Sequence, residues 1–470
     1  MMQLQNSRLS ERLATLALAS LVIIAPLSTA PESSAPPSFA GAAEKQELFW
    51  PDGSLRASYH LDAGGRLDGA YLEFFENGKQ KLKAYYKRDR LQGRYESFAS
   101  GGQRVLRCTY DHGILHGKYE EFDDAGELRL RGEYAEGARA GEFRHLRAGQ
   151  TISKQLWEAD ELALLEGLEP YPRSRAQLRA GLQRIHDSEQ TSTAPTKRKP
   201  PKFDIDADGD LSPAARAAQD VGRDGALRRL MAYRFLVGLE WSDMTLDDSY
   251  NHFASMAARL LVKVGELNHT PANPGLPGDE YRAGYRGTSS SNLARGSSLV
   301  GSINSYMDDS DPSNIDRIGH RLWCLNPAML RTGFGLRGSF SAMWSFDANR
   351  SKIPALELVA YPPAGFMPAE YFGPRHAWSV QFLGSPLAGA ALKDLFVRVF
   401  PLDENFLRSD AALELDHLGQ RGSTLIFRPA GVSVLPGSRY WVEIGRRKGA
   451  IRKASLRYLV EFTELAAEDN

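Results

Sequence analysis

A repeat of 24 residues in the first third of the chain restricts the possible folds more than any other feature of the sequence. Each repeat has a glycine followed two positions later by an aromatic residue, and a second glycine keeps the same period. Between the glycines, apolar residues alternate with polar ones, as at Leu82, Ala84 and Tyr86, which is the period of a half-buried strand. The recurring positions are Gly69, Gly93, Gly117 and Gly141; Tyr71, Tyr95, Tyr119 and Phe143; Phe74, Phe98 and Phe122; Gly78, Gly102 and Gly126; and Tyr86, Tyr110 and Tyr134.

This pattern predicts an array of β-hairpins over residues 47–145, with glycines in the turns. A single hairpin is marginally stable in water, whereas stacked hairpins cover each other's apolar faces. A first, degenerate unit begins at residues 50–53, and the aromatic residues are interpreted as the core of the array. The pattern resembles the MORN-like repeat of antitoxin-type proteins. We expect the array to contact a partner, either an unknown protein or a component of the cell envelope.

The first 43 residues have the composition of a targeting segment. Arg8 and Arg12 precede an apolar run over residues 13–27, and small residues follow it. The run is shorter than the roughly 20 residues that cross a bilayer as a helix, and Pro26 interrupts it. It predicts a signal peptide and a short linker over residues 1–43, and therefore secretion or a place in the periplasm or cell envelope. An uncleaved N-terminal anchor is the alternative, and no later stretch is apolar enough to span a membrane.

Charge and cysteine content exclude several classes of protein. The 58 basic and 58 acidic residues balance, so no net charge attracts nucleic acid. Two cysteines in 470 residues are too few for a disulfide scaffold or a cysteine-rich metal site. We expect Cys108 and Cys324 to be free thiols, and Cys324 to be buried.

An acidic loop follows a linker in the middle of the chain. Residues 187–202 are rich in Pro, Thr and Lys and predict a flexible linker. In the acidic loop over residues 203–215, oxygen-bearing side chains alternate with other residues from Asp204 onward. Counted from Asp204, Gly209 stands sixth, as in the first half of an EF-hand calcium loop. The twelfth position, which needs a bidentate glutamate, is Ala215. Two interpretations stay open, a Ca²⁺ site and an acidic turn without metal. The candidate Ca²⁺ ligands are Asp204, Asp206, Asp208, Asp210 and Ser212.

Residues 224–347 carry helical periodicity and a set of short motifs. Apolar residues at helical spacing predict helices over residues 226–234 and 253–264 and another around Leu299 and Met307. The motifs and their order resemble the CAP superfamily of cysteine-rich secretory, antigen 5 and pathogenesis-related proteins, in its bacterial form. The matching pieces are Leu267-Asn268-His269, Ser291 to Gly296, Gly319-His320-Arg321, Asn326-Pro327 and Gly333-Phe334-Gly335.

The resemblance implies an α-β-α sandwich (a CAP/SCP domain) with a cleft lined by two histidines. By position these are His269 and His320, which could share a Zn²⁺ ion or line a pocket for a small apolar ligand. The family's glutamate before Asn292 is replaced by Ser291, which removes a carboxylate that could orient a histidine or act as a base. The ligand-cleft prediction therefore comprises His269, His320, Ser291 and Asn292. The alternatives are a Ser–His nucleophile and histidines that only bond the backbone at helix ends.

Residues 354–466 contain short alternating strand segments separated by turn residues. The segment from Pro436 to Ile444 resembles a strand of immunoglobulin-like and fibronectin-type modules, and this predicts a β-sandwich. The predicted fold class is a multidomain α+β protein, with a β-hairpin repeat array, an α-β-α sandwich and a C-terminal antiparallel β-sandwich.

These features together predict an exported, modular binding protein without catalytic activity. Its two-histidine cleft would hold a small ligand or a metal, and its repeats would contact a partner. Two alternatives are a metal-dependent hydrolase that uses His269 and His320 and a purely structural envelope protein. Ser291 in place of the glutamate argues against the hydrolase, and the question of enzymatic activity stays open.

Overall fold

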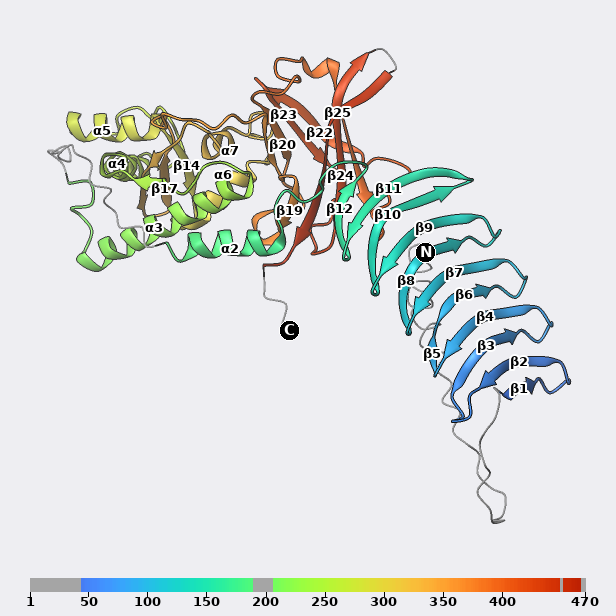
Figure 1. Ribbon diagram of the computed structural model, residues 1–470. Helices are drawn as coiled ribbons and strands as arrows, with labels where there is room; N and C mark the ends of the chain where they lie inside the picture. The colour runs from blue at the N-terminus through green and yellow to red at the C-terminus, as the bar shows by residue number, and fades with distance from the viewer. Residues whose placement is uncertain (1–43, 189–205, 449–450, 466–470) are drawn as a thin grey trace. The chain divides into compact units, whose positions relative to one another are not determined.

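The computed structural model describes residues 44–188, 206–448 and 451–465 (Figure 1). The predicted signal peptide over residues 1–43, Asp204 and residues 189–202 of the predicted linker lie outside the described residues. The chain divides into two compact units. One runs up to Arg104 and includes Tyr110–Gly113; the other contains Val105–Thr109 and the chain from Ile114 onward.

The α+β class predicted from the sequence is wrong. The protein is mostly β, with 40% strand and 22% helix, and its largest element is an antiparallel sheet of 12 strands. The helical α-β-α sandwich expected over residues 224–347 is not supported. The error has a physical reason. Amphipathic helices give the strongest periodic signal in that segment, whereas its strands are only two to five residues long and give almost none.

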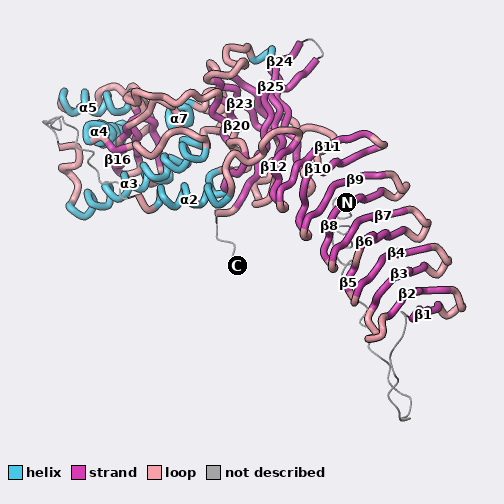
Figure 2. The backbone as a smooth tube through the Cα atoms, viewed as in Figure 1, coloured by secondary structure: helices cyan, strands magenta, loops and turns pink. Residues whose placement is uncertain are grey.

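The large sheet follows the chain order from residue 44 to residue 165, beyond the predicted boundary at residue 145. Successive strands pair in the order β1-β2-β3-β4-β6-β7-β8-β9-β10-β11-β12, and β5 pairs with β4. Figure 2 shows these strands joined by short turns. Their bounds are β1 Glu44–Phe49, β2 Leu55–Leu61, β3 Leu67–Phe74, β4 Gln80–Lys87, β5 Arg90–Leu91, β6 Gly93–Phe98, β7 Arg104–Asp111, β8 Ile114–Phe122, β9 Leu128–Ala135, β10 Ala138–Arg147, β11 Gln150–Glu158 and β12 Glu161–Leu165.

The periodic glycines and aromatic residues have distinct roles in this sheet. Gly69 has φ of 126°, and a Cβ there would lie 3.0 Å from the Cβ of His60 on the neighbouring strand, so a larger residue would be strained. In the first unit Tyr71 contacts the rings of Tyr59 and Tyr86, at centroid distances of 5.9 and 5.4 Å. In the second unit Tyr119, Tyr134 and Phe143 form a similar chain of rings. The aromatic residues thus pack on one another across the strands.

Helices fill much of the middle of the chain and begin and end at recognisable caps. Ser212 accepts a hydrogen bond from Ala215 N at the start of α3, and Asp247 caps α4. Gly265, in the left-handed region at φ 81°, ends α4. The helices are α2 Arg175–His186, α3 Pro213–Leu236, α4 Asp248–Val264, α5 Gly278–Ser289, α6 Leu299–Asp308 and α7 Gly319–Cys324, with short 3-10 turns at Ala369–Tyr371 and Leu392–Asp394.

Two small sheets lie among these helices. One pairs β13 with β15 in parallel, and the other has the order β14-β17-β16. Helix α4 packs closely on β16 and β17. The close approach is possible because Gly335 of β16 has no side chain: a Cβ there would lie only 2.2 Å from the backbone N of Ser255 in α4. The strands are β13 Thr245–Leu246, β14 Ser291–Arg295, β15 Arg331–Thr332, β16 Phe334–Arg337 and β17 Phe340–Trp344.

The C-terminal part contains two four-stranded sheets, ordered β18-β20-β23-β22 and β19-β25-β24-β21. The pair β19 and β25 is parallel, so these sheets differ from the all-antiparallel sandwich that was predicted. Buried residues of α2, α3 and both sheets share one hydrophobic core. The strands are β18 Leu358–Tyr361, β19 Gly365–Pro368, β20 Trp378–Phe382, β21 Leu395–Leu402, β22 Leu415–Arg421, β23 Thr424–Pro429, β24 Arg439–Lys448 and β25 Ile451–Thr463.

Within the described ranges, no helix combines the length and the apolar character that a membrane crossing requires. Cys108 and Cys324 are both free thiols, as predicted, and both are buried, which was predicted only for Cys324.

Candidate functional site

The structure brings His269 and His320 together. His269 lies on the loop after α4, and His320 is the second residue of α7. Their ring centroids are 6.5 Å apart, with 29° between the ring planes. His269 is exposed and the His320 side chain is 24% exposed, so a ligand in solution can reach both rings.

Each imidazole is held through its Nδ1 atom. His269 Nδ1 lies 2.9 Å from the carbonyl oxygen of Thr288, and His320 Nδ1 lies 2.8 Å from Oδ1 of Asp309. A carbonyl and a carboxylate only accept hydrogen bonds, so in the neutral rings Nδ1 carries the proton. The Nε2 atoms are then left as acceptors, and neither has a hydrogen-bond partner in the described part of the chain.

Asp309 is the residue that fixes His320. It ends α6 in the left-handed conformation, at φ 42°, and is only 3% exposed. Its Oδ2 atom accepts a hydrogen bond of 2.9 Å from the backbone N–H of His320 and a longer one, of 3.4 Å, from that of Arg321, so both carboxylate oxygens hold the start of α7. The ring of Tyr306 stacks on the His320 ring at 5.5 Å and restricts it further.

Ser291 and Asn292 lie buried beneath the histidine site. They begin β14 and are 4% and 2% exposed. Asn292 Nδ2 donates to the backbone oxygen of His320 at 2.9 Å, and Asn292 O accepts from the Tyr306 hydroxyl at 3.0 Å. Asn292 therefore ties β14 to α6 and α7. Ser291 Oγ is buried and has no hydrogen-bond partner within the described residues.

A zinc ion at the two histidines stays a prediction. In the described residues no group of three or more His, Cys, Asp or Glu side chains is placed to hold a metal ion. Cys324 is near Asn292, but burial raises the pKa of its thiol to about 12, which disfavours the thiolate that binds metals. Two imidazoles on one zinc, at about 2.0–2.1 Å per Zn–N bond and a tetrahedral angle, would bring the rings closer together than they are here.

The acidic loop faces arginines. Asp208 pairs with Arg223 at 2.8 Å and with Arg337 at 2.7 Å. Asp206 pairs with Arg216, and Asp210 lies 3.4 Å from Arg337. Ser212 is occupied as the cap of α3. A Ca²⁺ ion would have to take these oxygens from guanidinium groups, so calcium binding here also stays a prediction.

Sequence reasoning missed three residues of the histidine site. Asp309 ends α6, and it also orients His320. Thr288 and Tyr306 contribute a carbonyl and a ring, and no residue type or spacing signals such roles. The signal that could have been used for Asp309 is weak: a carboxylate shortly before the Gly319-His320 pair.

Comparisons with known proteins add little. No family model matches the chain. No curated protein matches it. Among solved structures, a complex described as the S. aureus TarM G117R mutant with fondaparinux, alpha-GlcNAc-glycerol and UDP is 15% identical, with a TM-score of 0.14, and the match covers 30% of this chain and 24% of that one. The GtfA/B complex bound to UDP and GlcNAc is 14% identical, with a TM-score of 0.12, covering 33% and 28%. The chain thus spans about a quarter of each, and scores this low carry no argument.

Proposed function

We propose that this protein is a non-enzymatic binding protein that acts outside the cytoplasm, with His269 and His320 as its ligand site. The observation that carries the proposal is the pair of Nε2 atoms left free by the bonds to Thr288 and Asp309. Export is proposed from the basic and apolar N-terminal segment. The repeats would contact a protein or an envelope component.

The geometry favours a small ligand that donates hydrogen bonds over a metal held by the histidines alone. Hydrogen bonds span about 2.8–3.0 Å between heavy atoms, so a ligand of a few atoms bridges rings 6.5 Å apart without moving them. Helix α7 also presents Trp323, one turn after His320 and 36% exposed. Its ring packs on Phe346 at 4.4 Å and offers a place for an apolar part of the ligand.

Two measurements on the full chain test this site. Native mass spectrometry detects a ligand that co-purifies, and isothermal titration with Zn²⁺ detects metal binding. We expect at least one of them to show binding that His269→Ala and His320→Ala abolish. Asp309→Asn should weaken binding about 10- to 100-fold, because partners that orient a ligating histidine have effects of this size.

His186→Ala is the matched control. His186 also bonds an aspartate, Asp187, through Nδ1 at 2.9 Å, but its side chain is 82% exposed and lies far along the chain from the site. It should leave binding unchanged. Binding that is absent, or that survives loss of both His269 and His320, would contradict the proposed site.

A second candidate is the metal-dependent hydrolase, and the Asp309–His320 pair is the observation in its favour. A carboxylate that orients an imidazole is a common arrangement for a general base. The two candidates differ in one assay. The assay is the rate of p-nitrophenyl acetate hydrolysis in the presence of Zn²⁺. If the protein only binds, the native chain and the His320→Ala variant should have the same rate. If it is the hydrolase, the rate should be much lower in His320→Ala.

A further inference from the structure

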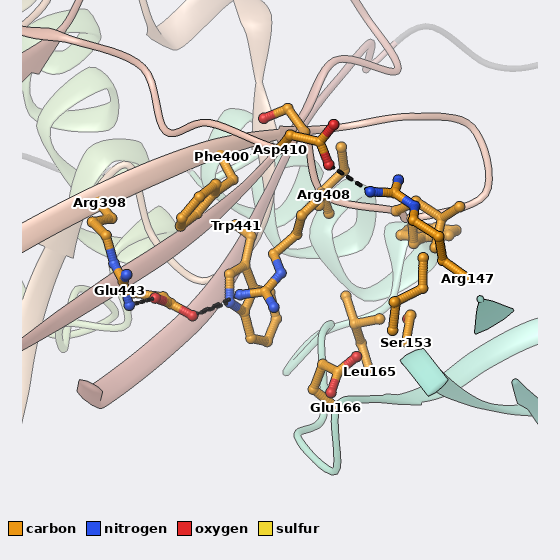
Figure 3. Close-up of a pocket in the computed structure, with 15 residues that line it drawn as sticks. Arg147, Ser153, Leu165, Glu166, Arg398, Phe400, Arg408, Asp410, Trp441 and Glu443 are labelled. Carbon is orange, nitrogen blue, oxygen red and sulfur yellow. Dashed lines mark hydrogen bonds and ion pairs between the residues drawn. The ribbon is translucent and has the colours of Figure 1, made fainter. Parts of the chain in front are cut away.

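A cavity of about 490 Å³ lies in the second compact unit, away from the histidine site (Figure 3). The last hairpins of the large sheet, β10 to β12, supply Arg147, Ser153 and Leu165, and Glu166 follows them. Strands β21 and β24 and the loop after β21 supply the rest. The residues from this second side that matter below are Arg398, Phe400, Phe406, Arg408, Asp410, Trp441 and Glu443.

One carboxylate organises the charges of this cavity. The Glu443 side chain is only 6% exposed, and it accepts from Arg398 Nη2 at 2.5 Å and from Arg408 Nη1 at 2.8 Å. Trp441 Nε1 also donates to it, at 3.3 Å. Figure 3 shows Glu443 between the two arginines. Two half-buried guanidinium groups therefore share a single negative charge on this side of the cavity.

The two arginines keep most of their donors free. A guanidinium has five N–H groups, and in the described part of the chain each of these arginines uses only one nitrogen in a hydrogen bond. Arg398 Nε is buried and has no partner among the described residues. Phe400 lies under both guanidinium groups, at 5.7 and 5.4 Å from its ring centroid, and keeps them in place.

The whole lining holds three arginines and three carboxylates, so the excess of positive charge is local to the side of the cavity around Glu443. Arg147 pairs at 2.9 Å with Asp410, whose side chain is 84% exposed, and such surface pairs are weak and easily exchanged. Glu166 Oε1 already accepts from the backbone N–H of Lys154. Beside Glu443, two guanidinium groups thus face one carboxylate, which leaves an excess of N–H donors on that side of the cavity.

We propose that this cavity binds a small molecule that carries an oxyanion, either a carboxylate or a phosphate, on a ring-sized apolar body. Forked guanidinium donors match the geometry of both oxyanions. Leu165, Phe400 and Phe406 supply apolar surface for the body of the ligand. The volume lies within the range of about 300–1,000 Å³ usual for such sites. The proposal is independent of the histidine site, because the two share no residue.

Isothermal titration of the full chain with benzoate and with phenyl phosphate tests the proposal, and benzyl alcohol serves as the neutral probe. We expect one or both anions to bind, with at least tenfold weaker binding of benzyl alcohol. The preferred anion distinguishes a carboxylate ligand from a phosphate ligand. Affinity should fall as salt is raised, because the attraction is partly screened.

The variants separate an anion site from a purely structural ion pair. Arg408→Gln should weaken anion binding at least tenfold, and the exposed Arg147→Gln should weaken it less. Glu443→Gln should strengthen binding, because it removes the competing charge. Arg282→Gln is the control, since Arg282 pairs with Asp279 on the surface and is outside the cavity. Because Arg147 is 65% exposed, its variant should fold even where Arg408→Gln does not.

Equal affinity of the native chain for the anions and for benzyl alcohol, or no detectable binding of either anion, would overturn the proposal. So would anion binding that Arg147→Gln and Arg408→Gln leave unchanged, or that Glu443→Gln weakens in a folded protein.

Discussion

Carboxylates withdrawn from water need partners, and the buried Asp309 and the partly buried Asp208 have different ones. Asp309 is bound to the backbone and the ring of His320. Asp208 is bound to Arg223 and Arg337, which are themselves 7% and 8% exposed. The same residue type therefore serves a candidate ligand site in one place and a buried ion-pair cluster in the other, and the neighbours make the difference.

The ion pairs of Asp208 predict an acid-sensitive contribution to stability. Burial raises the pKa of this carboxyl, but Arg223 and Arg337 outweigh burial and lower the pKa from 3.8 to about 2. A pKa that is lower in the folded chain stabilises the fold above the unfolded value, and this contribution is lost as the pH falls from about 4 to about 2. It amounts to about 2 kcal/mol.

Asp208→Asn should lower the free energy of unfolding by about 2 kcal/mol or more at pH 7. The difference in unfolding free energy between the variant and the native chain should become smaller toward pH 2. Urea denaturation of both proteins at pH 7, 4 and 2 measures this difference. Asp220→Asn is the control, because Asp220 pairs with the same Arg223 but is 60% exposed. A gap of constant size at all three pH values would show that the charge of Asp208 is not responsible.

At the scale of elements, close packing depends on glycines between α4 and the three-stranded sheet. A Cβ on Gly335 would lie 2.2 Å from the backbone N of Ser255 and 2.4 Å from the backbone C of Ala254. A Cβ on Gly287 in α5 would lie 2.0 Å from the carbonyl oxygen of Phe253. Helix α4 is thus packed between a strand and a helix that both approach it through glycine.

Gly335→Ala should lower the free energy of unfolding by about 1–3 kcal/mol, because α4 has to move away from β16. Differential scanning calorimetry should show a lower Tm. Gly222→Ala is the control: it lies inside α3, where a Cβ would be 3.4 Å from Cδ1 of Leu299. Alanine favours the helix there by about 1 kcal/mol. A Gly335→Ala protein as stable as Gly222→Ala would refute this account of the packing.

At the scale of the whole molecule, an aromatic cluster joins the last hairpins to the C-terminal strands within the second unit. Trp157 of β11 contacts Phe143 of β10 and Phe406, with ring centroids 6.5 and 5.9 Å apart. Trp441 of β24 and Leu459 of β25 belong to the same buried cluster. The ring packing that crosses the strands of this unit therefore continues into its C-terminal part.

Trp157→Ala should cost about 3–5 kcal/mol of unfolding free energy, the usual range for removing a buried aromatic side chain. Tyr85→Ala, at a site 48% exposed on the large sheet, should change it by less than about 0.5 kcal/mol. Chemical denaturation followed by circular dichroism compares the two. If both variants lose a similarly small amount of unfolding free energy, this cluster does not hold the hairpins to the C-terminal strands.

Local patterns were readable in the sequence because their causes are local. The helix predicted over residues 253–264 is part of α4, and Gly265 ends it in the left-handed conformation. The short strand segments predicted over residues 354–466 correspond to strands in the structure, among them β18, β20, β21, β23, β24 and β25. Helices α2 and α5 and strands β11, β12, β19 and β22 are among the elements that were missed. For α2 the signal was present, because Leu178, Leu182 and Ile185 stand at helical spacing after the capping box of Ser174 and Gln177. The predicted fold class failed because small strands leave little periodicity.

The sequence by itself indicated many of the helices and strands, because side-chain period, caps and turn glycines act over a few residues. It also placed His269 and His320 among the candidate site residues. Only the tertiary structure decided which groups meet: Asp309 with His320, Asp208 with two arginines, and Glu443 with the arginines of the cavity. Such pairings join residues from separate elements. They depend on how those elements pack, and no spacing along the chain encodes that.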